Sequence, residues 1–215
     1  LPVDRFYWRD GGVESLGVAC DADVLTNCST TADDDMSVFV QGLAQDFGWQ
    51  ASYQSEYCPT LSAWVGSLSE CVHHGALLLV DYGYGRGEYY HPQRNMGTLM
   101  CHYRHRAHDD PFFLPGLQDI TAWVDFTALA EAADACGLAV DGYTSQAMFL
   151  LGCGLDRVLS ERSADAKDGG LALNAEARQL TLPGMMGERF QVMGLGRGLG
   201  REPAAFSLRD LRYRL

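Results

Sequence analysis

The chain has 215 residues, and a hydrophobic content of 47% is enough for a packed core and excludes wholesale disorder. Its formal net charge of −12 opposes nonspecific binding to nucleic acid or to an anionic membrane, so we expect no nucleic-acid partner. No apolar run approaches the roughly 20 residues that cross a bilayer, which argues against membrane insertion. Seven scattered cysteines without C-x-x-C spacing disfavour a zinc ribbon and a disulfide scaffold.

The first part of the chain predicts a β-hairpin and then a helix. Residues 3–8 and 13–20 are typical of strands around a Gly-Gly turn, and residues 21–31 are polar and rich in turn formers. Three aspartates at 33–35 indicate a helix start, because acids stabilise the positive end of the helix dipole. Gly48 is expected to end this helix.

A second helix is predicted from Leu61 to about Val72. Its apolar residues recur at helical spacing and share one face: Leu61, Trp64, Val65, Leu68 and Val72.

An unbroken apolar run at 76–80 then predicts a strand that is covered on both faces, as in parallel α/β sheets. Asp81 is expected at its carboxyl edge, where open α/β sheets form their ligand crevice. Behind it, Gly83, Gly85 and Gly87 predict a flexible loop that passes close to a ligand. A phosphate-binding turn is disfavoured, because Pro92 discourages the helix that such a turn requires.

The remainder alternates between helix and strand. A polar, aromatic stretch at 97–115 is followed by a helix at 126–136, with Asp125 as N-cap and Gly137 as C-cap. Strands are predicted at 138–143 and 190–194. Residues 144–155 suit either helix or strand, and residues 160–180 are helical in composition with a break at 168–170.

The polar residues suggest two kinds of chemistry, metal binding by histidines and acid–base or ionic contacts by carboxylates. His102, His105 and His108 have a spacing that suits a metal on a helix, but the cations Arg104 and Arg106 lie between them, so we expect no metal site. The other candidates are carboxylates: Glu56, Asp81, Asp119 and Asp125.

Several blocks occur in an order that is specific as a set: LPVDRF at 1–6, SE at 55–56, DYG at 81–83, GTL at 97–99, YRH at 103–105, DDP at 109–111, QDITA at 118–122, VDFTALA at 124–130 and GYTSQA at 142–147. With them the chain resembles the S-adenosylmethionine-dependent methyltransferases long catalogued as a domain of unknown function. Their mitochondrial members are arginine methyltransferases that assist the assembly of respiratory complex I. The likeness runs from residue 1 to about 155 and returns near Phe190.

The resemblance implies an α/β fold, namely the C-terminal part of a Rossmann-like class I methyltransferase sheet that is mixed, with its last strand antiparallel. Residues 1–74 would be a β-hairpin and helical insertion after the fourth core strand. Residues 75–215 would form the C-terminal half of the core, with a helical excursion at about 156–181. Core strands five, six and seven would lie at 76–81, 142–151 and 190–193.

The same resemblance places the cofactor loop and the ribose-binding acid upstream of Leu1. The chain is therefore expected to be a fragment that carries the acceptor side and is inactive alone. Leu1 and Pro2 would form only the edge of the S-adenosylmethionine pocket.

The leading hypothesis for function is a protein arginine N-methyltransferase. Carboxylates must hold the guanidinium of such an acceptor, and Asp81, Glu56 and Asp119 are the catalytic candidates. Candidate substrate-loop residues are Tyr82, Gly83, Gly85, Tyr103 and Arg104. Two alternatives stay open: a non-catalytic assembly factor on the same fold, and a small-molecule methyltransferase.

The expected partner is a protein substrate or an assembly partner. Residues 1–58 carry ten acids against Arg5 and Arg9, and this acidic region is the expected docking face. A homodimer is left open. The resemblance implies the bacterial cytoplasm for this chain and the mitochondrial matrix for the eukaryotic relatives.

Overall fold

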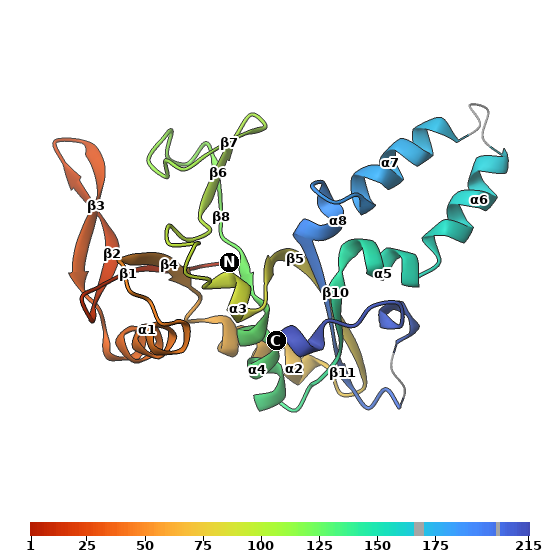
Figure 1. Cartoon of the computed structure of the whole chain (residues 1–215), viewed down its shortest axis with the longest axis horizontal. Coiled ribbons are helices and arrows are strands. Elements are labelled where there is room, and N and C mark those ends of the chain that lie inside the picture. The colour runs from red at the N-terminus through yellow and green to blue at the C-terminus, as the bar shows by residue number, and fades with distance from the viewer. Residues whose placement is uncertain (166–169, 201–202) are drawn as a thin grey trace. The chain divides into compact units, whose positions relative to one another are not determined.

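The computed structural model describes residues 1–165, 170–200 and 203–215, and it shows an α/β chain (Figure 1). The chain divides into two compact units. Unit 1 comprises Leu1–Thr60 and Arg86–Asp125, and unit 2 comprises Leu61–Gly85 and Phe126–Leu215. In the described parts of the chain, no helix is both long and apolar enough to span a membrane.

Unit 1 begins with an antiparallel sheet in the order β3-β2-β1-β4. Its strands are β1 (Asp4–Arg9), β2 (Gly12–Asp21), β3 (Val24–Thr31) and β4 (Tyr53–Tyr57). The predicted hairpin of β1 and β2 is confirmed. The polar turn predicted for residues 21–31 is wrong: Ala22 and Asp23 alone make the turn, with φ of 45° and 65°, and β3 follows.

Helix α1 (Asp34–Phe47) has the predicted ends and packs on β1 and β2 (Figure 1). The Asp33 carboxylate accepts a hydrogen bond from the Met36 N–H at 2.7 Å, so the helix has a side-chain N-cap. Gly48 ends it in the left-handed region at φ 60°. The buried face of α1 joins an aromatic core whose members are Phe6, Met36, Val40, Leu43, Trp49, Tyr53, Tyr89 and Tyr90.

The second stretch of unit 1 contains α3 (Arg86–Tyr89), β6 (Met100–Tyr103), β7 (Arg106–His108), β8 (Asp119–Thr121) and β9 (Val124–Asp125). Strands β7, β6 and β8 form a small antiparallel sheet in that order. The short helix α3 ends three residues before Pro92, so no helix runs through this proline, as predicted.

Unit 2 is built on a sheet in which β11 (Phe190–Arg197) lies between β10 (Ala139–Ser145) and β5 (Gly75–Tyr84). Strand β11 is antiparallel to both neighbours, so β5 and β10 share one direction. The predicted antiparallel last strand is thus confirmed. Helices α2 (Leu61–Cys71) and α4 (Phe126–Ala135) pack on each other, and Gly137 follows α4 in the left-handed region as predicted.

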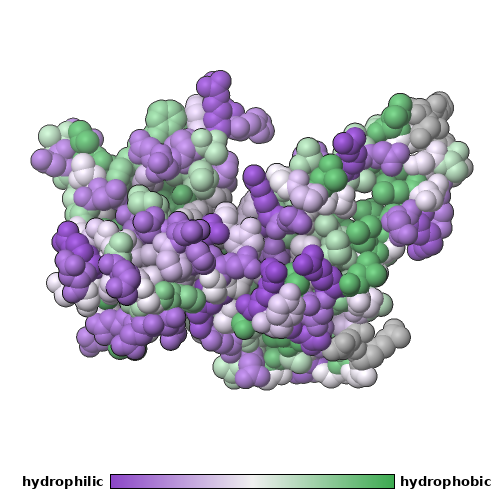
Figure 2. Space-filling view, viewed as in Figure 1, coloured by the Kyte–Doolittle hydropathy of each residue, from purple (hydrophilic) through white to green (hydrophobic). Residues whose placement is uncertain are grey.

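The other helices of unit 2 are α5 (Gln146–Gly152), α6 (Leu155–Asp165), α7 (Leu171–Thr181) and α8 (Met186–Arg189), followed by the short 3-10 turns η1 (Ala204–Phe206) and η2 (Arg212–Arg214). Figure 2 shows apolar surface over α5 to α7, to which Leu151, Val158 and Leu171 contribute. The sixth strand expected to reach residue 151 is wrong, because β10 ends at Ser145 and α5 begins there. Part of the break predicted at 168–170 lies outside the described residues.

Strand β5 confirms the predicted run at 76–80 but not its complete coverage. Leu78 and Val80 are 52% and 46% exposed. The neighbouring strands β10 and β11 are covered at Gly142 and Gly194, against which the buried Phe206 packs. In the predicted apolar face of α2, Trp64 is likewise 46% exposed, whereas Leu61 and Val65 are buried.

Candidate functional site

Glu56, one of the predicted carboxylates, is fully buried in β4. Its Oε2 accepts hydrogen bonds from the Thr98 N–H at 2.9 Å and from the Thr98 hydroxyl at 3.2 Å. Its Oε1 accepts from the Leu99 N–H at 3.3 Å. Burial raises the pKa of Glu56, and the hydrogen bonds from Thr98 and Leu99 oppose this shift. The carboxylate thus anchors the segment at 97–99.

Thr98 connects this carboxylate to two other parts of unit 1. Its hydroxyl oxygen accepts a hydrogen bond from the Trp123 N–H at 3.0 Å and lies 3.3 Å from the Tyr89 hydroxyl. The Tyr89 hydroxyl also donates to the Trp123 carbonyl, at 3.3 Å. The Tyr90 hydroxyl donates to the Glu56 carbonyl at 2.9 Å. We call Glu56, Thr98, Tyr89, Tyr90 and Trp123 the Glu56 network.

Charged groups flank the Glu56 network on the same unit. The Arg94 guanidinium lies 4.6 Å from the Trp123 ring centroid, within cation–π range. Arg86 donates to the largely buried Asp125 carboxylate at 3.2 Å. Burial raises the pKa of Tyr89 and Tyr90, so both phenols stay protonated and serve as donors at neutral pH.

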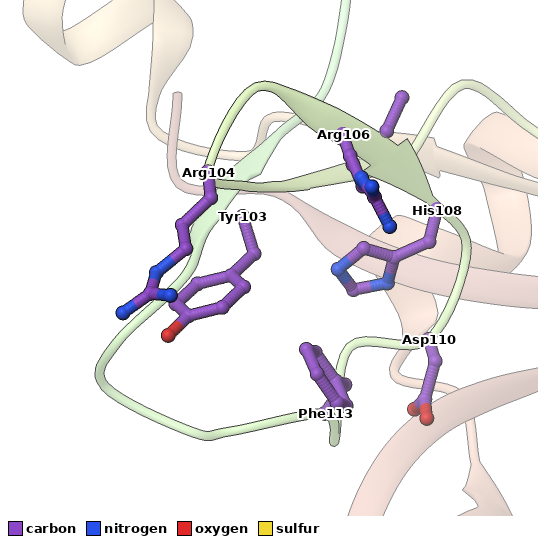
Figure 3. Close-up of a pocket in the computed structure, with 7 residues that line it drawn as sticks. Tyr103, Arg104, Arg106, His108, Asp110 and Phe113 are labelled. Atoms are coloured by element: carbon purple, nitrogen blue, oxygen red, sulfur yellow. The ribbon is translucent and has the colours of Figure 1, made fainter.

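A second cluster of polar groups lies at the β6–β7 hairpin, where a cavity of about 810 Å³ opens (Figure 3). Its lining includes Tyr103, Arg104, Arg106, His108, Asp110 and Phe113. We call it the hairpin cavity. The Phe113 ring centroid lies 5.8 Å from that of Tyr103 and 5.2 Å from that of His108, in edge-to-face arrangements. Two of the five predicted substrate-loop residues, Tyr103 and Arg104, therefore line this cavity.

The three histidines at 102, 105 and 108, at which no metal site was expected, are spread along this hairpin. His102 pairs with Ala107 in the strand register, His105 lies in the turn, and His108 pairs with Cys101. Across residues 1–165, 170–200 and 203–215, no group of three or more His, Cys, Asp or Glu side chains is arranged to hold a metal ion.

The β5 candidates lie in unit 2. Asp81 is exposed, and its Oδ1 accepts from the Tyr82 N–H at 2.8 Å. The predicted flexible glycine loop is wrong, since β5 continues to Tyr84 and includes Gly83. Gly85 is buried, and a side chain there would collide with the Arg214 carbonyl, so this glycine serves close backbone packing. The roles assigned to Asp81, Tyr82, Gly83 and Gly85 stay predictions.

Tyr82 also borders a groove of about 360 Å³ in unit 2, with Met185, Met186, Arg189 and Phe190 among its other lining residues. The Tyr82 and Phe190 ring centroids are 4.0 Å apart.

The remaining candidates are exposed. Asp119 lies in β8 opposite His102, and Leu1 and Pro2 precede β1. Sequence reasoning did not identify Thr98 as a hub, nor Phe113 as part of a cavity. The GTL block at 97–99 contained a signal for the role of Thr98. Gly97 adopts the left-handed region (φ 78°) and so lets the backbone approach the Glu56 carboxylate.

The fold and these sites define an α/β protein whose last core strand runs antiparallel to its neighbours. The chain belongs to the family described as "Putative S-adenosyl-L-methionine-dependent methyltransferase", whose model matches residues 1–144. A comparison with the curated proteins gave no match.

Two solved structures from Burkholderia thailandensis are similar over the whole chain. One, an uncharacterized protein, is 36% identical with a TM-score of 0.92, and the match covers 100% of this chain and 57% of that one. The other, a structure bound to S-adenosyl-homocysteine, is 36% identical with a TM-score of 0.93, and the match covers 100% and 55%. The chain thus spans a little over half the length of the solved structures it matches.

Two of the described cavities, the hairpin cavity and the groove at Tyr82, contain arginines that disfavour the sulfonium of S-adenosylmethionine. The cofactor carries a sulfonium cation, whereas the hairpin cavity presents Arg104 and Arg106 and the groove at Tyr82 presents Arg189. These cations oppose a sulfonium. No catalytic step is therefore assigned to the cofactor within these cavities.

Proposed function

We propose that this chain forms the acceptor side of an S-adenosylmethionine-dependent methyltransferase. The observation that carries the proposal is its membership of that methyltransferase family, together with a relative of 36% identity that is bound to S-adenosyl-homocysteine. The solved relatives extend beyond the matched region. In this proposal the cofactor's main contacts lie there, and the 215 residues bind it weakly alone.

The proposed acceptor is an arginine side chain of a protein. A net charge of −12 attracts a basic polypeptide, and carboxylates hold a guanidinium in a two-pronged geometry. Of the three predicted carboxylates, Asp81 and Asp119 are exposed and free to meet an acceptor, whereas Glu56 is buried. Asp81, in unit 2, is thus the proposed guanidinium ligand; Asp119, in unit 1, is a separate candidate, and Glu56 is a positioning residue that holds the segment at 97–99.

The test uses the protein at its full encoded length with S-adenosylmethionine labelled in the methyl group. We expect label in partner proteins, recovered after hydrolysis as methylarginine. Isothermal titration of the same protein should show cofactor binding. Absence of binding would remove the enzyme hypothesis and leave the assembly factor. Label recovered only in small molecules would instead establish a small-molecule methyltransferase.

The role of Asp81 as a ligand of the acceptor arginine is tested with Asp81→Asn. This substitution keeps the oxygen that faces the Tyr82 N–H and removes only the charge. We expect kcat/KM for the arginine acceptor to fall by about tenfold, as for one lost charge-assisted hydrogen bond. The matched control is Asp134→Asn, another exposed aspartate of unit 2. Equal activity of the two variants would exclude Asp81 as a ligand of the acceptor.

A further inference from the structure

The hairpin cavity carries positive charge that is not neutralised within the described chain. In residues 1–165, 170–200 and 203–215, neither the Arg104 nor the Arg106 side chain forms an ion pair or a hydrogen bond. The Arg104 guanidinium only stacks on the Tyr103 ring, at 5.3 Å from its centroid. Asp110 also lines the cavity, but its Oδ1 accepts from the Phe112 N–H at 2.9 Å, and in Figure 3 its carboxylate points away from the rings.

The cavity also holds a polar atom without a partner. His108 Nε2 is shielded from solvent and has no hydrogen-bond partner in the structure. Figure 3 shows the guanidinium of Arg106 pointing toward the His108 ring. Buried polar atoms of this kind nearly always bind something, and a ligand with an acceptor atom would satisfy both groups at once.

The backbone of the β6–β7 turn adopts φ angles that are unfavourable for most residues. The β6–β7 turn places Arg104 and His105 at φ of 48° and 64°, a region that two-residue hairpin turns usually fill with Asn or Gly. Gln118 donates to the Pro111 carbonyl at 2.8 Å and to the Asp110 carbonyl at 3.2 Å, which fixes the facing loop. The turn and the facing loop thus hold the two sides of the hairpin cavity in place.

From these observations we propose that the hairpin cavity binds a small molecule in which an anionic group, a carboxylate or a phosphate, is attached to a flat ring. Arg106 and His108 bind the anionic group, and Arg104 adds a second cation at the rim. The edge-to-face rings of Tyr103 and Phe113 pack against the ligand ring. The cavity volume of about 810 Å³ falls within the range of about 300–1,000 Å³ found for small-molecule sites.

The test of this site is independent of the test of the proposed methyl transfer. A sulfonium donor and a guanidinium acceptor are both cations, and the arginines of the hairpin cavity repel both. The binding test therefore uses neither S-adenosylmethionine nor a methyl acceptor, and its outcome does not depend on the outcome of the methylation experiment.

The test is isothermal titration of the full chain with four probes: phenyl phosphate, benzoate, inorganic phosphate and phenol. We expect phenyl phosphate and benzoate to bind, inorganic phosphate to bind more weakly, and uncharged phenol not to bind. Phenol binding as tightly as phenyl phosphate would overturn the role of charge. Inorganic phosphate binding as tightly as phenyl phosphate would overturn the role of the ring.

Two variants separate the charge from the ring. Arg106→Gln should weaken every anionic probe by about tenfold, as expected for one lost charge-assisted hydrogen bond. Phe113→Leu should weaken phenyl phosphate but leave inorganic phosphate unchanged. Arg178→Gln removes an exposed arginine in unit 2 and serves as the matched control.

Both Arg106 and Phe113 are exposed, so the variants should fold, which circular dichroism and thermal melting would verify. The proposal is overturned if Arg106→Gln binds phenyl phosphate as tightly as the unaltered chain. It is equally overturned if Arg178→Gln causes the same loss.

Discussion

At the scale of single residues, Glu56 shows how an ionisable group becomes structural. Its two carboxylate oxygens are occupied by two backbone N–H groups and one hydroxyl. The sequence singled out Glu56 as a carboxylate of interest. Its burial was not predictable, because the donors Thr98 and Leu99 lie more than 40 positions further along the chain, and only the tertiary fold brings them to β4.

Removing this carboxylate leaves its donors unsatisfied in a buried place. We expect Glu56→Ala to lower the free energy of unfolding by about 2–4 kcal/mol, since each stranded donor carries a desolvation penalty. Urea denaturation followed by tryptophan fluorescence measures the change. A loss below that of an ordinary surface substitution would show that the Glu56 network does not hold the segment at 97–99.

The raised pKa of Glu56 predicts a pH dependence with a definite sign. Burial makes the folded protein bind this proton more tightly than the unfolded chain does. The stabilisation from the bound proton is therefore fully present below the ordinary value of 4.5 and is lost as pH rises through the raised folded value. Unfolding free energies measured across this window should fall with pH, and Glu56→Gln should remove that part of the slope. An unchanged slope in the variant would contradict the assignment.

Gly97 permits the approach of the backbone to Glu56. It lies at φ 78°, and a Cβ there would collide with the Glu56 carboxylate. We expect Gly97→Ala to destabilise unit 1 by about 2–3 kcal/mol, through both strain and overlap. Gly87 in α3 has free space around it, so Gly87→Ala is the control and should be neutral or stabilise by up to about 1 kcal/mol. Equal effects of the two substitutions would argue against the close approach.

At the scale of elements, local signals in the sequence determined which segments were predicted. Helix α1 was predictable because Asp33 and Gly48 are ordinary caps, and β11 because its apolar run ends in glycines. Strands β3 and β7 were not predicted, since their hairpin turns use Ala22-Asp23 and Arg104-His105 in place of the usual Asn-Gly. The composition of these two segments therefore indicated loops, whereas pairing with a neighbouring strand makes them β3 and β7.

One side chain links three elements of unit 2. Arg197, at the end of β11, donates to the carbonyls of Ser69, Val72 and Cys136 at 2.9, 2.9 and 2.6 Å, at the C-terminal ends of α2 and α4. A cation there also faces the negative ends of two helix dipoles.

We expect Arg197→Gln to lower the free energy of unfolding by about 2–3 kcal/mol, because several charge-assisted bonds are lost together. The exposed Arg178, changed to Gln, should alter stability by less than about 0.5 kcal/mol. Chemical denaturation of both variants gives the comparison. A small effect at Arg197 would mean that water replaces the guanidinium at these carbonyls.

At the scale of the whole molecule, the α/β class and the direction of the last strand followed from sequence because the order of the blocks is specific. The grouping of the elements into two compact units could not be predicted from the sequence. The chain passes from one compact unit to the other at 60/61, 85/86 and 125/126, and each unit combines segments that are distant in sequence. Hydrophobic periodicity reports which face of an element is buried, but not which distant segment buries it. The exposed side chains of Leu78 and Val80 show the same limit, since an apolar run predicts burial on both faces.

The charge of the whole chain leads to a prediction about its partners. If the acidic region at 1–58 recruits a basic polypeptide, affinity for an arginine-glycine peptide should fall as salt rises from about 0.1 M to about 1 M, which shortens the screening length from about 10 Å to about 3 Å. Fluorescence anisotropy of the labelled peptide measures this, with a glutamate-glycine peptide as the control that should not bind.

The double variant Asp10→Asn, Asp23→Asn locates the effect. Both residues lie in hairpin turns at positive φ, which asparagine also adopts, so the fold is retained while two charges are removed. We expect affinity for the basic peptide to fall by roughly twofold to fivefold, in line with the modest energies of exposed charges. Binding that is unaffected by salt and by these substitutions would exclude an electrostatic docking face, and the basic acceptor would then have to be recognised at the exposed carboxylates alone.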